Sequence, residues 1–143
     1  MLNKKVVGRF LILSTMYMGA SAALAETVVV VSAKSSASAL TMEQVSDIFL
    51  GKSAVLPGGG QAVPVDQAEG PLREDFYHKA TGKTGSQVKA FWSKQIFTGK
   101  GQPPKEVGDS AAVKALVANN PNLIGYIDKS ALDASVKSVL SVK

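Results

Sequence analysis

The stretch Val63-Pro-Val-Asp-Gln-Ala-Glu-Gly-Pro-Leu-Arg-Glu-Asp-Phe-Tyr77 decides the fold, because it changes from a strand pattern to a helix pattern within one short segment. Residues 63–65 favour a β-strand, and residues 66–70 form a polar loop. Pro71 suits the first position of a helix, since its φ is fixed and it has no N–H group to leave unpaired. The segment therefore predicts a strand, a turn and a helix whose N-terminus faces the loop.

The start of this helix is the candidate site. Free backbone N–H groups and the positive end of the helix dipole converge there and favour a bound anion. A small anion in front of Leu72 would also lie beside the guanidinium of Arg73. The predicted ligand-binding residues are Glu69, Gly70, Pro71, Leu72 and Arg73.

A purely structural interpretation of the same residues stays open. Glu69, Glu74 and Asp75 are carboxylates near a helix start, where they stabilise the helix dipole. Arg73 adds a cation to the positive end of that dipole, which does not help the helix and therefore indicates a function. The alternative is a surface ion pair of Arg73 with Glu69 or Asp66 across the turn.

The first 25 residues have the pattern of an export signal. Lys4, Lys5 and Arg9 form a basic start, residues 10–18 are apolar, and Ala23-Leu-Ala25 is a small-x-small cleavage site before Glu26. The apolar run is too short to span a membrane as a helix. We therefore expect residues 1–25 to be cleaved and residues 26–143 to form a single periplasmic domain that does not span the membrane. An uncleaved amphipathic anchor is the alternative.

Charge and cysteine content restrict the class of protein. The chain has 16 Lys and Arg against 11 Asp and Glu, a net charge of +5. The predicted signal holds three of the cations and no acid, so 13 cations and 11 acids remain, a net charge of +2. Without a Lys/Arg run, this mild charge does not indicate nucleic-acid binding. The absence of cysteine means that the domain is stabilised by its core alone, as fits a periplasmic protein.

The remaining pattern predicts a three-layer α/β domain. The apolar run in residues 27–31 favours a buried strand of the kind common in parallel sheets. Capping boxes at Thr41 and Thr84, and a cap at Asp109, predict three further helices. Residues 105–107 are too polar to assign firmly, and residues 123–127 and 136–142 are the last two strands. This order predicts a mixed sheet with helices on both faces and no second domain.

The helix after Thr84 carries an apolar stripe. Val88, Phe91, Trp92 and Ile96 recur at helical spacing. Aromatic residues on such a stripe pack into a core more often than they bind ligand. We therefore expect Trp92 to be buried with Val88 and Ile96.

The sequence gives no support for an enzyme, a metal site or a cofactor. Two Gly-Lys-Ser/Thr sites, at Gly51 and Gly82, lack the earlier glycine of a phosphate-binding loop and follow helices instead of starting them. His78 is the only histidine, it has no partner at metal-binding spacing, and it is predicted to face solvent. The acids near residue 70 have no activated nucleophile beside them.

Three segments together resemble the periplasmic phosphate-binding proteins of ABC transporters, in particular their short single-domain relatives. They are Leu40-Thr-Met-Glu-Gln-Val-Ser-Asp-Ile-Phe-Leu-Gly-Lys52, the stretch from Val63 to Tyr77, and Pro121-Asn-Leu-Ile-Gly-Tyr-Ile127. The segment from Phe91 to Pro104 is typical of the short relatives. The resemblance implies one lobe of a type II periplasmic-binding fold that binds an oxyanion.

Two departures from this family weaken the implied site. A full binding protein closes two lobes on its ligand, whereas this chain resembles one lobe. The central loop of the family resembles Asp-Gly-Ser-Gly-Thr, whose hydroxyls help to hold phosphate, and matching backwards from Phe76 puts Gly70 and Leu72 at the two hydroxyl positions. Two lost hydrogen bonds to a charged ligand remove ~3–6 kcal/mol of binding free energy.

The sequence thus favours a non-enzymatic periplasmic binding module with a weak oxyanion site or a site shared between two copies. The alternative is an envelope interaction protein that uses the former ligand cleft to dock on another protein, such as an ABC permease.

Overall fold

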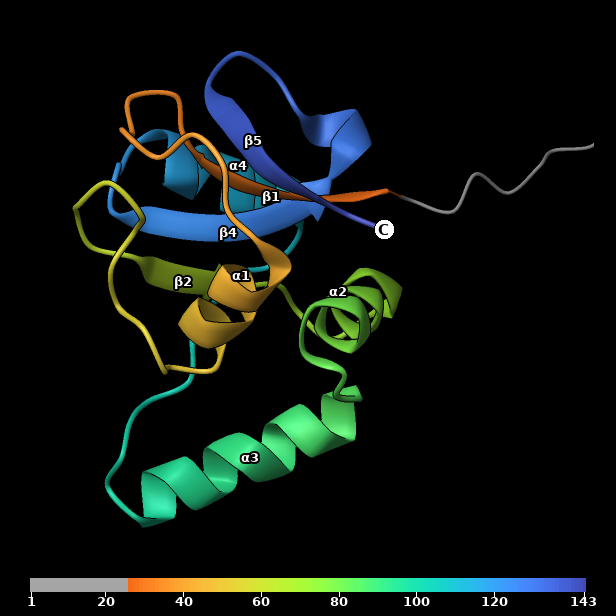
Figure 1. Ribbon diagram of the computed structural model, residues 1–143. Helices are drawn as coiled ribbons and strands as arrows, with labels where there is room; N and C mark the ends of the chain where they lie inside the picture. The colour runs from red at the N-terminus through yellow and green to blue at the C-terminus, as the bar shows by residue number, and fades with distance from the viewer. Residues whose placement is uncertain (1–25) are drawn as a thin grey trace, which may run out of the picture.

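The structure is a computed structural model that describes residues 26–143, so the predicted signal segment lies outside the described residues. Five strands, four α-helices and one short 3₁₀-helix form the described part (Figure 1). In chain order they are β1 (Thr27–Ser32), α1 (Met42–Phe49), β2 (Val63–Asp66), α2 (Pro71–Thr81), α3 (Gly85–Phe97), β3 (Lys105–Glu106), α4 (Ser110–Ala118), β4 (Leu123–Asp128), η1 (Lys129–Ala131) and β5 (Val136–Val142). None of the described helices is both long and apolar enough to cross a membrane.

The strands form one mixed sheet in the order β3-β2-β4-β1-β5. Strand β2 runs parallel to both β3 and β4, whereas β1 is antiparallel to its neighbours β4 and β5. The predicted mixed sheet is confirmed. The prediction of a buried first strand is also confirmed, but its expected parallel pairing is wrong. The apolar run of β1 indicates that both faces of this strand are buried. A strand inside the sheet is buried on both faces whether it pairs parallel or antiparallel, so the run cannot predict the direction of pairing.

Helices cover both faces of the sheet, as the sequence predicted. Helix α4 packs on one face through Val113 and Val117, while α1 and α2 cover the other face (Figure 1). Gly125 in β4 permits the close approach of α4, because a Cβ at this position would lie 2.5 Å from Cγ1 of Val113. The α4 face is therefore packed against the backbone of the sheet.

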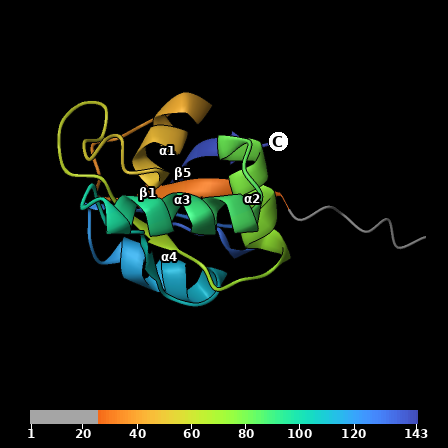
Figure 2. The same cartoon turned by 90° about the horizontal axis from the view of Figure 1, so that it is seen from below.

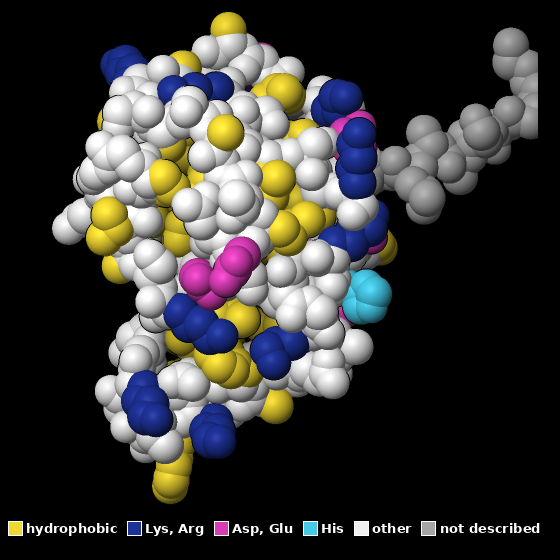
Figure 3. Space-filling model, viewed as in Figure 1, with side chains coloured by type: hydrophobic (Ala, Val, Ile, Leu, Met, Phe, Trp, Pro, Cys, Tyr) yellow, Lys and Arg dark blue, Asp and Glu magenta, His cyan; other side chains and the backbone are white. Residues whose placement is uncertain are grey.

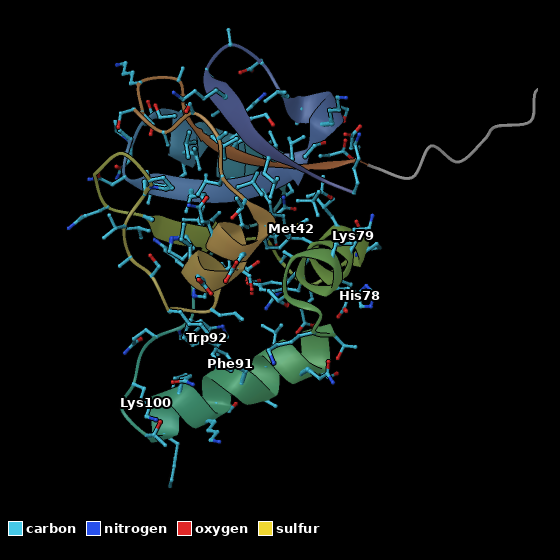
Figure 4. All side chains as sticks on the ribbon, in the orientation of Figure 1. Met42, His78, Lys79, Phe91, Trp92 and Lys100 are labelled. Atoms are coloured by element: carbon cyan, nitrogen blue, oxygen red, sulfur yellow. The ribbon has the colours of Figure 1, made fainter. Side chains whose placement is uncertain are left out.

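Helix α3 lies below α1 and α2 in the view of Figure 1 and crosses in front of the sheet in Figure 2, and its buried residues belong to the same core cluster as those of α1 and α2. Val88 and Trp92 are buried, and Trp92 points with Phe91 from α3 toward α1 (Figure 4). The prediction that Ile96 joins this core is wrong, because 54% of Ile96 is exposed. Ile96 lies about 80° around the helix from Val88, at the margin of the buried face, whereas Gln95 on the same turn lies within about 20° of Val88 and faces Leu50 across a hollow.

Candidate functional site

All five predicted site residues line one hollow at the carboxyl end of β2. The loop after Asp66 and the first turn of α2 form one side of this hollow, which has a volume of about 510 Å³. Gly108, Asp109 and Ala112 at the start of α4 form the other side. The N-termini of two helices therefore meet at the edge of the sheet where parallel strands end, which is where α/β proteins commonly bind ligands.

The start of α2 is open. Thr41, Thr84 and Asp109 cap α1, α3 and α4 with side-chain hydrogen bonds, whereas the N-cap residue of α2 is Gly70, which has no side chain to do so. The first backbone hydrogen bond at this end is donated by Glu74 N to Gly70 O. Within residues 26–143, the N–H groups of Leu72 and Arg73 have no partner.

Arg73 is turned away from these N–H groups and toward two carboxylates. Its Nη2 lies 3.7 Å from Asp66 Oδ2, and its Nη1 lies 3.4 Å from Glu106 Oε2. Nη1 also donates to the backbone oxygen of Gln67 at 3.3 Å. Burial lowers the pKa of Arg73, but the charges around it, chiefly that of Asp66, outweigh this effect and raise the pKa above its ordinary value. The ion pair with Asp66 was one alternative in the sequence analysis.

Asp66 is the centre of a buried polar cluster, which we call the Asp66 cluster: Asp66, Gln67, Arg73, Tyr77 and Tyr126. Only 5% of the Asp66 side chain is exposed, so its charge has little access to water. Oδ2 accepts from Tyr77 Oη at 2.6 Å, and Oδ1 accepts from Gln67 N at 2.8 Å and from Tyr126 Oη. With Arg73 beside it, the carboxylate has four partners, which satisfies a buried charge.

The two tyrosines stay protonated in this cluster. Burial raises the pKa of both Tyr77 and Tyr126, and the negative charge of Asp66 raises it further. The hydroxyls therefore act as donors to Asp66 over the whole physiological pH range. The sequence pattern singles out neither tyrosine. Tyr126 reaches Asp66 from the neighbouring strand β4, 60 residues further along the chain, where no local spacing could reveal the contact.

Gln67 connects the cluster to α4. Its Nε2 donates to Tyr126 O at 2.7 Å and to Ser110 Oγ at 3.1 Å. Ser110 Oγ in turn accepts from Asp128 N at 3.0 Å. These hydrogen bonds thus join the loop that carries the candidate site to β4 and to the first residue of α4.

Glu74 has a partner in another helix. The sequence placed it at the start of α2 as a dipole or capping residue, but its Oε2 accepts from Gly85 N at 2.9 Å, at the start of α3. A Cβ at Gly85 would lie 1.9 Å from Glu74 Oε1, so a larger residue there would displace the Glu74 carboxylate from its present position. Glu74 therefore fixes the orientation of α3 relative to α2, while Asp75 makes an ordinary helical ion pair with Lys79 at 3.1 Å.

The charges around the hollow oppose a free anion. Arg73 is already paired, and the carboxylates of Glu69 and Asp109 also line the hollow. Among the described residues no group of three or more His, Cys, Asp or Glu side chains could hold a metal ion. His78 is exposed, as predicted, and points away from the rest of the domain (Figure 4).

Comparison with solved structures identifies the class of protein whose fold this domain shares. It resembles substrate-binding proteins of phosphate ABC transporters. One is a putative phosphate ABC transporter substrate-binding protein with bound phosphate from Clostridium perfringens, at 25% identity and a TM-score of 0.64. Another is an ABC-type phosphate transport receptor from Vibrio cholerae, at 25% identity and a TM-score of 0.63. PstS from Borrelia burgdorferi shares the fold at 12% identity and a TM-score of 0.59.

The match covers 80% of this chain but only 44%, 45% and 46% of those three chains, respectively. The chain thus spans less than half the length of each of these substrate-binding proteins, in agreement with the single lobe implied by the sequence. No family model and no curated protein matches the sequence. The resemblance stated from the sequence motifs is confirmed at the level of fold.

Proposed function

We propose that this protein is an exported, non-enzymatic binding module that contributes one half of an oxyanion site. The ligand class is phosphate-like, and the contact is made by the open N-terminus of α2. One observation carries the proposal: the uncapped start of α2 lines a hollow in a domain whose fold resembles part of phosphate-binding proteins, one of which was solved with phosphate.

Backbone N–H groups supply the attraction in this proposal. Those of Leu72 and Arg73 have no partner within residues 26–143, and the helix dipole adds partial positive charge at the same place. The side chains supply less than the sequence suggested, because Arg73 is paired and Glu69 repels an anion. We therefore expect weak binding by the isolated domain.

In this proposal the other half of the site comes from groups outside residues 26–143, for example from a second copy or from another protein. Residues 26–143 correspond to less than half of each similar structure, and their hollow at α2 is open to solvent. A partner that closes the hollow would remove water and strengthen each hydrogen bond to the ligand. Binding that depends on protein concentration would distinguish a site shared by two copies from a site within one.

Gly70→Asp tests the site directly. Gly70 has an extended backbone, and a Cβ there meets nothing closer than 4.0 Å, so the side chain fits. An aspartate N-cap accepts the free N–H groups itself and competes with the ligand. Calorimetry with phosphate, sulfate and acetate should show weak heat for the parent and for the matched control Gly70→Ala, and none for Gly70→Asp. Equal heats for all three proteins would refute the site.

Export is part of the proposal and has its own test. If the basic and apolar pattern of residues 1–25 acts as a signal, the intact mass of the exported protein corresponds to a chain that begins at Glu26. A retained Met1 in the membrane fraction would show that the segment is an anchor.

The alternative function is docking on an envelope protein, such as an ABC permease, through the same hollow. The observation in its favour is the pair of carboxylates, Glu69 and Asp109, which suit cationic side chains of a partner better than a free anion. Pull-down from periplasm and solubilised membranes, with the parent and Glu69→Gln, which removes one of these carboxylates, tests it. Recovery of the same proteins by both, or of none, would count against docking at this hollow.

A further inference from the structure

Positive charge is distributed unevenly in this domain. Residues 83–105, which we call the basic arm, comprise α3 with its flanking loops and the start of β3. The arm contains five lysines (Lys83, Lys89, Lys94, Lys100 and Lys105) and no acid. The rest of residues 26–143 has eight cations against all 11 acids. No ion pair joins an arm lysine to an acid within residues 26–143, whereas Lys79, Lys114 and Lys129 are all paired.

The arm also carries the most exposed large apolar side chain of the described residues. Phe97, the last residue of α3, is 91% exposed, and the adjacent Ile96 is 54% exposed. The remaining exposed apolar residues lie singly on other elements. On the face that Figure 3 shows, a hydrophobic tip and Lys and Arg side chains mark the lower part of the molecule, where α3 lies. The Glu74 carboxylate meets α3 only at its first residue, Gly85, at the opposite end from Phe97.

The helix geometry directs these groups away from the domain. At about 100° per residue, Phe97 lies about 180° around the helix from the buried Val88. Lys89 and Lys94 lie on either side of Phe97, about 80° and about 60° away. The outward face of α3 therefore presents an aromatic ring between lysines, and it ends in a loop that carries Lys100.

We propose that the basic arm docks the domain on an anionic phospholipid surface, with Phe97 and Ile96 inserted between headgroups. Lysines flanking exposed aromatic and aliphatic side chains are the composition of helices that lie in a membrane interface. A lysine close to an anionic lipid surface strengthens binding by about fivefold. Charge complementarity thus selects the occupant of this surface.

Other occupants fit less well. A second copy would bring five like charges if the arms paired, and residues 1–25 carry three cations and no acid. A stable protein interface buries about 800 Å² per partner around a broad apolar centre. The arm offers only two adjacent exposed apolar side chains, which suffice for shallow insertion into lipid.

The test measures cosedimentation of residues 26–143 with vesicles. Residues 1–25 must be absent, since their apolar segment would bind lipid by itself, and the described fold lies entirely within residues 26–143. The parent should bind vesicles of equal phosphatidylcholine and phosphatidylglycerol, and should release them as the salt concentration rises. Equal binding to pure phosphatidylcholine, or no binding to either, would overturn the proposal.

Two pairs of variants separate the contributions. Phe97→Ser should weaken binding at least about tenfold, whereas Val55→Ser, at another exposed apolar residue, should not change it. Lys94→Gln/Lys100→Gln should weaken binding about 25-fold, and Lys34→Gln/Lys143→Gln, which removes equal charge outside the arm, much less. Equal loss in each pair would show that net charge or general hydrophobicity, and not the arm, decides binding.

The solution mass of parent and Phe97→Ser completes the test. A monomer in both cases agrees with a lipid surface as the occupant. A dimer that Phe97→Ser dissociates, together with absent vesicle binding, would assign the surface to a second copy and overturn the proposal. None of these measurements involves Gly70 or the hollow at α2, so their failure is distinct from failure of the oxyanion site.

Discussion

Helices α2 and α3 are neighbours in the fold, but their charged and aromatic side chains have opposite surroundings. At α2, the charged side chain of Arg73 turns inward to a carboxylate that is 5% exposed, and the tyrosines around it are fully buried. Along α3, the lysines have no acidic partner within residues 26–143, and Phe97 projects from the surface. Charge at the candidate site therefore serves mainly to hold the structure together, whereas the lysines of α3 remain free to attract a partner.

Removal of Asp66 should have the largest effect. Asp66→Ala leaves two buried hydroxyls and the guanidinium of Arg73 without their acceptor, so we expect a loss of about 3–5 kcal/mol of unfolding free energy. Urea unfolding followed by fluorescence measures it. The control Asp75→Ala removes an exposed helical ion pair and should cost only about 0.3–0.5 kcal/mol. Similar losses for the two variants would remove the contrast between the buried cluster and the surface.

The second largest contrast should lie between Trp92 and Phe97, two of the three aromatic residues of α3. Trp92→Ala leaves a cavity beneath α1 and should cost about 3 kcal/mol, near the lower end for a large aromatic residue because α3 lies at the edge of the core. Phe97→Ala should leave the free energy of unfolding unchanged within about 0.5 kcal/mol. Thermal melting of both variants makes the comparison. A large loss from Phe97→Ala would mean that this side chain is packed and not available for lipid.

Arg73→Gln should have an intermediate effect of about 1–2 kcal/mol. The variant removes the ion pairs with Asp66 and Glu106, of which only the first is buried, and glutamine can still donate one hydrogen bond. We expect a lower melting temperature and little change in anion binding, because backbone N–H groups make the proposed contact. A melting temperature equal to or above that of the parent, with anion binding weakened tenfold, would instead assign the ligand contact to the Arg73 side chain.

The exposed ion pair of Asp133 and Lys114 should have the smallest effect, although it is shorter than that of Arg73, at 2.9 Å. Hydrogen bonds from Ser135 and Lys114 lower the pKa of Asp133 from 3.8 to about 2. The small stabilisation from this carboxylate is therefore present above pH 3.8 and is lost as the pH falls toward 2. Carbon-detected NMR titration measures the pKa. Asp133→Asn, which removes the titrating group, should make the free energy of unfolding depend less on pH between about 2 and about 4. An unshifted Asp133 would show that the pair does not persist in solution.

The sequence alone determined the secondary structure and the class of fold. The capping boxes at Thr41 and Thr84 and the Pro71 helix start depend on neighbours within a few residues, so local pattern is sufficient to find them. The apolar stripe of α3 predicts burial of Val88, Trp92 and Ile96, and this prediction is confirmed for Val88 and Trp92 and wrong for Ile96. Periodicity tells which residues share a face of a helix, but it cannot tell where the covering layer ends.

Only the tertiary structure decided how the candidate site is built. Tyr126 and Asp66 are 60 residues apart in sequence and meet because β4 pairs with β2, and Glu106 reaches Arg73 because β3 lies on the other side of β2. Glu74 belongs to α2 but accepts a hydrogen bond from the start of α3, where Gly85 has no side chain to displace the carboxylate. Local sequence thus fixes which groups each element carries. The pairing of strands that are distant in sequence brings Asp66 and Glu106 to Arg73, so these charges neutralise each other. The lysines of α3 meet no acid in this arrangement and remain exposed.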